Sequence, residues 1–274
     1  MRLSKFIASS GYASRRKSDT LIENGFVIVN NEVCRDFSTQ VMQGDEVIVE
    51  NTMISLPSPK IFSFYKPKNC LCTSRDPEGR KTIYDVLGQD YKNLISIGRL
   101  DYKSEGLLLL TNNGEIARYY ELPKNNIKRT YLVDLDGNYK NSYSHEMVSG
   151  IRFRGVKYSV LKSKLIKIKA QRFTLEITLS EGKNREIRNI AKYFNWNVLK
   201  LKRVSHGEYN ILSLKNSELR EEKISKNSIE KIKQDFNFSE IVSKLIISRN
   251  FDYKEIYSIE NPSVIRNEFK NDKD

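Results

Sequence analysis

Apolar residues follow a helical spacing in the first part of the chain and then alternate with polar residues. LSKFIAS and SRRKSDTLIEN predict two short helices, the second opening on a capping serine and ending at Gly25. FVIVNNEVC (26–34) predicts a hairpin turning at its two asparagines. QGDEVIVE (43–50) predicts a turn followed by a strand. Residues 1–50 are therefore expected to form a small folding unit.

A different pattern begins after residue 60. Residues 51–60 (NTMISLPSPK) contain two prolines and no core pattern, so they are interpreted as a linker. Beyond them, β-branched and aromatic runs alternate with turn residues. Strands are predicted at 61–66, 94–98, 107–111, 129–135, 159–169, 172–180, 197–203 and 208–214, and helices at 82–87, 114–121, 141–149 and 185–194.

Many strands with few helices between them predict an α+β domain with a mostly antiparallel, mixed β-sheet over residues 61–220. Residues 221–274 are rich in Lys, Asn, Ile and Glu. Apolar residues at helical spacing there predict an extension that is partly helical or frayed.

The stretch GRLDYKSEGLLLLTNNG places an aspartate just ahead of four leucines. Leu107–Leu110, bounded by turn residues, predict a short strand buried on both faces. Asp101 is then held on a loop at the mouth of a core strand, where rigid scaffolds often present reactive side chains. The alternative is that Asp101 only caps a turn by bonding to its own backbone.

Two further stretches carry polar side chains on predicted elements. IKRTYLVDL (127–135) starts a strand with Tyr131 among alternating residues. LSEGKNREIRNIAKYF (179–194) turns at a glycine and then predicts a helix with Arg185 and Arg188 on one side.

The charge of the chain favours a polyanionic partner. The formal net charge is +13, and residues 61–220 carry 30 basic and 16 acidic side chains, against seven of each in residues 1–60. An excess this large in one segment makes nucleic acid the leading partner. The first predicted helices also carry a basic face, formed by Arg2, Lys5, Arg15, Arg16 and Lys17.

Several classes of protein do not fit the composition. No apolar run approaches 18 residues and the N-terminus lacks a signal-peptide core, so no membrane segment is expected. Three cysteines argue against a disulfide framework and for a reducing compartment, the cytoplasm. With two distant histidines and no second cysteine pair, we expect no metal site.

Residues 1–50 resemble an S4 domain, the small RNA-binding module of ribosomal protein S4 and several RNA enzymes. The resemblance rests on RLSKFIASSGYASRRKSDTLIENGFVIVN and QGDEVIV, in which helix, glycine, SRR, second helix, glycine and hairpin follow in order. It implies that the basic face of the two helices binds RNA.

Residues 1 to about 215 resemble the RsuA/RluB family of pseudouridine synthases, which isomerise uridine in ribosomal RNA. FYKPKNCLCTSRDPEGRKTIYD, GRLDYKSEGLLLLTNNGE, KRTYLV and EGKNREIR occur in family order. The first and last of these are closer to the RluB branch, which acts on the large subunit. The resemblance implies a pseudouridine synthase fold and a reaction without cofactor or metal.

The resemblance also assigns roles to individual residues. It implies that Asp101 is the catalytic aspartate, that Tyr131 stacks on the target base and accepts a proton, and that Arg188 is the basic partner of the aspartate. The substrate-binding residues implied are Arg99, which fills the space left by the extruded uridine, Leu201, which packs beneath the base, Lys183 and Arg185.

The reaction chemistry agrees with the residue types present. Isomerisation breaks an N-glycosidic bond and forms a carbon–carbon bond to the same sugar, so nothing is oxidised overall and a carboxylate suffices as nucleophile. Burial favours the neutral form of a carboxyl group, whereas a nearby cation favours the ionised form. This explains an arginine beside the aspartate. Whether the carboxylate attacks the sugar or assists a glycal-like intermediate stays open.

Other functions are compatible with parts of the sequence. A non-catalytic S4-containing ribosome-assembly factor would need only the RNA-binding features, and a glycosylase would also use an aspartate but release the base. A small-subunit (16S) synthase is the alternative to a large-subunit (23S) enzyme. The expected partner is ribosomal RNA or a ribosome assembly intermediate, and the protein is expected to be a monomer.

Overall fold

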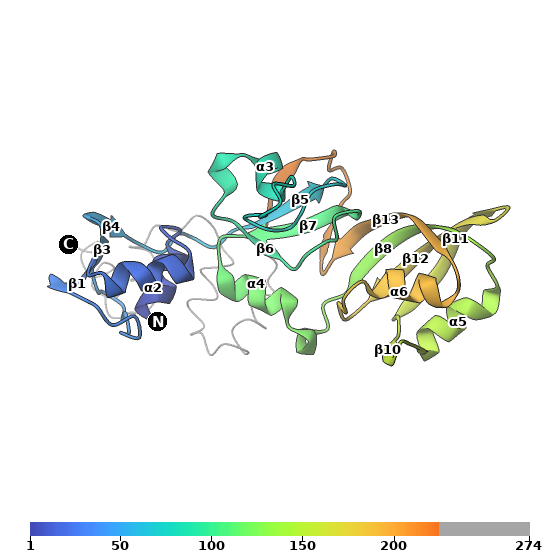
Figure 1. The fold of residues 1–274 in the computed structure, drawn as a ribbon, viewed down its shortest axis with the longest axis horizontal. Helices are drawn as coiled ribbons and strands as arrows, with labels where there is room; N and C mark the ends of the chain where they lie inside the picture. Colours follow the sequence, from blue (N-terminus) through green and yellow to red (C-terminus); the bar gives the residue numbers. More distant parts are fainter. Residues whose placement is uncertain (225–274) are drawn as a thin grey trace, which may run out of the picture. The chain divides into compact units, whose positions relative to one another are not determined.

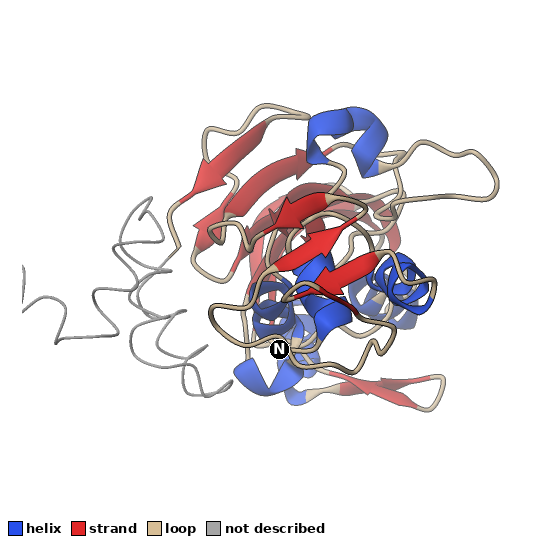
Figure 2. Cartoon of the chain, turned by 90° about the vertical axis from the view of Figure 1, so that its left-hand side faces the viewer, coloured by secondary structure: helices blue, strands red, loops and turns tan. Residues whose placement is uncertain are grey.

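The structure of the protein, a computed structural model, describes residues 1–224 (Figure 2). The described residues form two compact units, one of Met1–Lys60 with Asn112–Gly114, and a second of Ile61–Thr111 with residues 115–224. No helix within residues 1–224 combines the length and apolar character needed to cross a bilayer. The helices predicted beyond residue 224 lie outside the described residues.

The N-terminal unit contains two helices and a four-stranded sheet. The elements are α1 (Leu3–Ser9), α2 (Arg15–Glu23), β1 (Val27–Val29), β2 (Glu32–Val33), β3 (Val47–Val49) and β4 (Thr52–Ile54), with strand order β2-β1-β3-β4. The Ser14 side chain accepts a hydrogen bond from the Lys17 amide and caps α2 as predicted. Leu3, Ile7 and Ile22 are fully buried in the core of this unit.

Two pairs of residues with positive φ shape this sheet. Asn30 and Asn31 have φ of 50° and 69°, which confirms the predicted hairpin between β1 and β2. Glu50 and Asn51, with φ of 45° and 65°, turn the chain into β4, which pairs with β3. Strand β4 falls in the segment interpreted as a linker. The sequence missed it because an edge strand that leaves Met53 63% exposed carries no core pattern.

The second unit is built on a nine-stranded sheet covered by helices (Figure 1). The helices are α3 (Ile83–Leu87), α4 (Gly114–Glu121), α5 (Asn141–Ser149) and α6 (Glu186–Tyr193), with 3-10 turns η1 (Gln89–Tyr91) and η2 (Pro123–Asn125). The strands are β5 (Ile61–Lys66), β6 (Ile95–Ile97), β7 (Glu105–Thr111), β8 (Arg129–Asp136), β9 (Ile151–Phe153), β10 (Val156–Tyr158), β11 (Lys162–Lys169), β12 (Arg172–Leu179), β13 (Asn197–His206), β14 (Tyr209–Asn210) and β15 (Leu219–Glu222).

The strand order of this sheet is β11-β12-β8-β13-β7-β5-β15, with β14 beside β13 and β6 beside β7. All neighbours are antiparallel except β13 and β7. The predicted α+β fold with a mostly antiparallel sheet is therefore confirmed. Strands β9 and β10 form a separate two-stranded hairpin.

Strand β7 is the centre of the half of the sheet that carries the Asp101 loop. Leu107, Leu108, Leu109 and Leu110 are all fully buried, as the uninterrupted leucine run predicted. Leu108 and Leu110 pack in one cluster with Phe64 of β5, Ile83 of α3 and Leu100. A second cluster joins β8 and β12 to α5 and α6 through Val133, Leu175, Met147, Ile187 and Ile190.

Several predicted strands have different limits in the structure. Only Tyr209–Asn210 of the predicted strand 208–214 is a strand, because Leu212 donates its amide to the Asn210 side chain and Ser213 has a φ of 66°. The predicted strand 159–169 begins at Lys162. The β9–β10 hairpin was not predicted, because its strands have three residues each and carry charged side chains.

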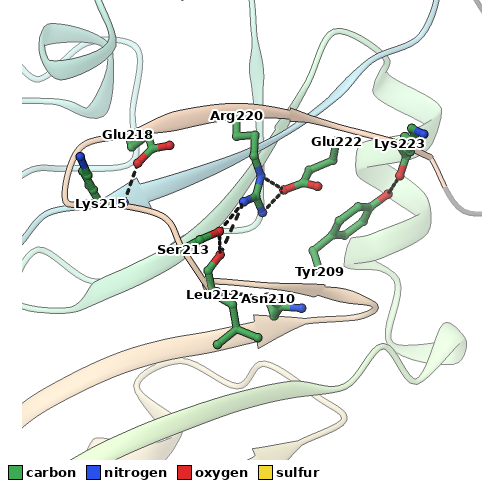
Figure 3. A network of polar contacts seen from close by, with 9 residues as sticks. All are labelled: Tyr209, Asn210, Leu212, Ser213, Lys215, Glu218, Arg220, Glu222 and Lys223. Carbon is green, nitrogen blue, oxygen red and sulfur yellow. Dashed lines mark hydrogen bonds and ion pairs between the residues drawn. The ribbon is translucent and has the colours of Figure 1, made fainter.

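The last described strand closes the β5 edge of the sheet. Leu219–Glu222 (β15) pairs antiparallel with β5, so the sheet continues past residue 220, where the domain was expected to end. In Figure 3, Arg220 joins this strand to the preceding loop, because its Nη1 lies 3.1 Å from Ser213 Oγ. Its Nε and Nη2 lie 2.9 Å and 2.7 Å from Glu222 Oε1 on the same strand. The Tyr209 hydroxyl donates to the Lys223 carbonyl.

Gly106 is required by the close contact between β7 and β13. It has a φ of +107°, and a Cβ there would lie 2.2 Å from the Arg203 carbonyl oxygen. We expect Gly106→Ala to destabilise the protein by about 3 kcal/mol, through backbone strain and overpacking, and to lower Tm in thermal unfolding. Gly79→Ala is the control, because Gly79 also has positive φ but nothing within 4 Å. Equal losses for the two variants would contradict the steric explanation.

Candidate active site

Asp101 lies on the loop that leads into β7. The Ser104 amide donates to the Asp101 carbonyl at 2.9 Å and closes a turn, so the side chain is presented at the start of the buried strand. The Asp101 side chain is 35% exposed. It is therefore accessible to a substrate and also within reach of protein cations.

Two arginines from α6 and its N-terminus approach this carboxylate. Arg188 Nε lies 3.3 Å from Asp101 Oδ2, and Arg188 Nη2 donates to Ser104 Oγ at 3.1 Å. Arg185 Nη1 lies 3.7 Å from the same Oδ2. The Arg188 side chain is only 12% exposed, so its charge is screened little by water and stabilises a negative charge at Asp101.

The start of α6 explains why both arginines point the same way. Arg185 has a φ of 51° and precedes the helix, so the predicted helix start at 185 is one residue early. Glu186 Oε2 accepts a hydrogen bond from the Lys183 amide and orders the preceding turn. Arg188 in the first turn of α6 and Arg185 just before the helix thus both reach Asp101 Oδ2.

A buried lysine fixes the backbone of the Asp101 loop. Lys66, the last residue of β5, is fully buried. Its Nζ donates to the carbonyl oxygens of Ser104 at 2.8 Å, Pro67 at 2.9 Å and Asp101 at 3.3 Å. Burial lowers the pKa of Lys66. The sequence analysis did not single out Lys66 as a site residue, although a lysine inside an apolar strand pattern was a usable signal.

The residue before Asp101 is held by a cysteine. The Leu100 amide and carbonyl each lie 3.4 Å from Cys72 Sγ, so the thiol contacts both backbone groups of Leu100. Burial raises the pKa of the Cys70 and Cys72 thiols, which keeps them neutral. All three cysteines are free.

Tyr131 and Leu201 lie on the face of the sheet that packs against α6. Tyr131 on β8 is opposite Arg203 on β13, and Arg203 is in turn opposite Gly106 at the start of β7. The half-buried Tyr131 packs against both apolar clusters of the sheet. Leu201 is buried two residues before Arg203, opposite Val133. The sheet register thus brings Tyr131 and Leu201 to the region where the Asp101 loop ends and β7 begins.

Arg203 is a second residue that sequence reasoning missed. It is 2% exposed, and its Nε donates to the Leu107 carbonyl at 2.7 Å, which joins β13 to β7. Along β13 it alternates in phase with Leu201 and out of phase with Lys200 and Lys202. Only the partner strands show that it is buried.

The remaining predicted residues are placed less closely. Arg99 is exposed two residues before Asp101. Lys183 Nζ is bound to the Lys157 carbonyl at 2.8 Å and to Glu181, so it is engaged by the protein and is not brought to Asp101. The predicted RNA-binding residues lie on or next to α1 and α2; these are Arg2, Lys5, Arg15, Arg16 and Lys17. In the described part of the chain, no three His, Cys, Asp or Glu side chains are grouped to hold a metal ion.

The ionisation of Glu186 makes the free energy of unfolding of the protein depend on pH. It is 3% exposed, and burial, with a smaller contribution from Glu181, raises its pKa to about 7. The carboxyl ionises at lower pH in the unfolded chain than in the folded one. Its contribution to stability is therefore complete below pH 4.5 and is lost as pH rises to about 7.

We expect Glu186→Gln, which keeps an acceptor for the Lys183 amide, to remove this dependence. At pH 8 the variant should be more stable than wild type by roughly 3 kcal/mol, and at pH 4.5 the two should be similar. Thermal unfolding at both pH values measures the difference. Glu32→Gln, at an exposed position on β2, should show no such effect. A pH-independent difference for Glu186→Gln would contradict the assignment.

Known protein families match both parts of the chain. Residues 60–193 match the family RNA pseudouridylate synthase, and residues 1–47 match the S4 domain. A Bacillus subtilis protein named ribosomal large subunit pseudouridine synthase B is 35% identical over 80% of this chain and 91% of its own. An uncharacterized RNA pseudouridine synthase of Rickettsia typhi is 38% identical, over 84% of this chain and 94% of its own.

A solved structure shares the same architecture. A crystal structure of a pseudouridylate synthase superposes with a TM-score of 0.57 at 29% identity, over 85% of this chain and 99% of that one. The similarity to the two relatives covers both domains at well over 30% identity. The resemblance inferred from the motifs is therefore confirmed, and the chain belongs to the family of RNA pseudouridine synthases.

Proposed function

We propose that this protein converts one uridine of large-subunit ribosomal RNA to pseudouridine, with Asp101 as the catalytic carboxylate. The observation that carries the proposal is the 3.3 Å contact between Arg188 Nε and Asp101 Oδ2, on a loop whose backbone is bound by the buried Lys66. The large subunit is favoured because relatives in Bacillus subtilis and Vibrio vulnificus, at 35% and 31% identity, are named for it.

The carboxylate acts where the glycosidic bond breaks. Cleavage of the N1–C1′ bond leaves the sugar electron-poor, and Asp101 stabilises it by attacking C1′ or by assisting loss of the C2′ proton to a glycal. The detached base turns and C5 bonds to C1′, while the Asp101–C1′ bond breaks or, in the glycal route, the proton returns to C2′. The C5 proton is then lost and N1 gains one. Arg188, itself hydrogen-bonded to Ser104 Oγ, contacts the Asp101 carboxylate and fixes its orientation.

Other side chains hold and turn the base. Tyr131 stacks on the uracil ring and accepts the proton from C5, and Leu201 supports the other side of the base. The target nucleotide leaves its stack to reach them, as bases do in RNA complexes that use aromatic platforms. Arg99 fills the vacated position, and Arg185 and Lys183 contact the RNA backbone.

The two parts of the chain divide the work. We assign RNA affinity to an S4 domain at residues 1–50, connection to residues 51–60, and catalysis to residues 61–220, with residues 221–274 as an extension. The substrate is free ribosomal RNA or an assembly intermediate. We place the activity in the cytoplasm and expect the protein to act as a monomer. The reaction has no net redox change, so it needs no redox cofactor.

The proposal is tested by carbodiimide mapping of unmodified large- and small-subunit RNA after incubation with the protein. We expect one new reverse-transcription stop in large-subunit RNA with wild type and none with Asp101→Asn. RNA affinity of the variant should stay within about twofold, because phosphate contacts dominate binding. A stop in small-subunit RNA would overturn the subunit assignment. Modification by Asp101→Asn would overturn the role of the aspartate.

Absence of modification, on naked RNA and on assembly intermediates, would favour a non-catalytic assembly factor, and release of free uracil would favour a glycosylase.

The role of the S4 domain is tested by removing positive charges from helix α2. Replacing Arg15, Arg16 and Lys17 by glutamine should weaken RNA binding and reduce the slope of log K against log salt by about 2, at ~0.7 per lost contact. The kcat at saturating RNA should be unchanged. The same triple replacement of Lys162, Lys164 and Lys167, exposed on β11, is the matched control. An equal change in both variants would show a general charge effect.

A further inference from the structure

A hollow of about 190 Å³ lies beside Arg188. Its rim is formed by Lys68, Asn69 and Lys103, and its wall by residues 198–201 of β13. The hollow exists because β13 pairs with β7 only at Lys202 and Arg203. Before residue 202, the Asp101 loop takes the place of a paired strand, and the two segments separate.

The lining combines positive charge with an apolar wall. Lys68 and Lys103 are exposed on the rim, whereas Lys200 is already paired with Glu105 at 3.0 Å. Leu199 is 47% exposed, because the register shift between Val198 and Lys200 places it outside the regular pairing. A cationic rim over an exposed leucine fits a ligand with an anionic group and a flat apolar face. A nucleotide has both.

The hollow adjoins the catalytic site and shares part of its lining. Arg188, which contacts Asp101, and Leu201, which is proposed to support the target base, both line the hollow, whereas Asp101 and Tyr131 do not. The Asn69 amide donates to the Tyr102 carbonyl at 2.8 Å, so the rim is tied to the Asp101 loop. A uridine held at Asp101 against Leu201 therefore leaves the part of the hollow around Leu199, Lys68 and Lys103 for another nucleotide of the same strand.

We propose that this hollow binds the nucleotide adjacent to the target uridine, with its base against Leu199 and its phosphate near Lys68 and Lys103. The inference rests on the proposed function for RNA as the ligand. Asn69 carries both a donor and an acceptor at the rim and is placed to distinguish the edges of different bases. The hollow then selects RNA by the base next to the target uridine.

The test measures Kd for uridine-centred RNA pentamers, intact or with an abasic residue on the 5′ or the 3′ side of the uridine. For wild type, one abasic position should weaken binding about tenfold, as expected for one stacked base, and the other should have little effect. Leu199→Ala should bind the intact pentamer about tenfold more weakly and lose this discrimination. Lys103→Gln should weaken all three pentamers alike.

Leu161→Ala is the matched control, because Leu161 is 49% exposed and does not line the hollow. It should behave as wild type, and unchanged Tm for both leucine variants excludes a folding effect. The inference is overturned if wild type binds intact and abasic pentamers equally or not at all, or if Leu199→Ala keeps the discrimination.

The Kd reports binding and not product formation, so the hollow and the catalytic assignment fail separately. Discrimination in a protein that forms no pseudouridine would retain the hollow and reject the reaction. Formation of pseudouridine by a protein that binds intact and abasic pentamers equally would retain the reaction and reject the hollow.

Discussion

The position of Asp101 depends on one buried ammonium group. Lys66 Nζ donates to three carbonyl oxygens, two of them from Asp101 and Ser104, and the side chain has no exposed surface. A buried charge is tolerated only when its hydrogen bonds are satisfied, and here the acceptors are the loop itself. The lysine and the loop therefore support each other: without the loop the ammonium would lose its acceptors, and without the ammonium each of these carbonyl groups would lose a donor.

Ser104 connects this backbone support to the charge on α6. Its carbonyl accepts from Lys66 and its hydroxyl accepts from Arg188, so one buried residue contacts two cations from distant parts of the chain. Arg188 adds the contact to the Asp101 carboxylate. The backbone and the side chain of the aspartate loop are thus fixed by β5 and α6 respectively, and neither element alone orients the carboxylate.

Strand β13 supplies the surface around this carboxylate. Arg203 joins it to β7 through the Leu107 carbonyl, and the close approach at Gly106 allows the two strands to pair there. Because the pairing is limited to Lys202 and Arg203, the residues of β13 before 202 are not paired with β7 and line the hollow beside Arg188. The same short parallel contact therefore places Leu201 near the proposed base site and Leu199 near the proposed neighbour.

Local patterns in the sequence determined the elements of this protein. The leucine run of β7, the serine cap of α2 and the Asn-Asn hairpin were predicted correctly because neighbouring residues decide them. The contact of Asp101 with Arg188 joins residues 87 positions apart and was expected only from family resemblance. Burial of Lys66, Arg203 and Glu186 was not predicted, since the local pattern around a charged residue does not show which distant segments cover it. Only the tertiary structure decides which charges are covered and paired, because that depends on the strands and helices packed against them.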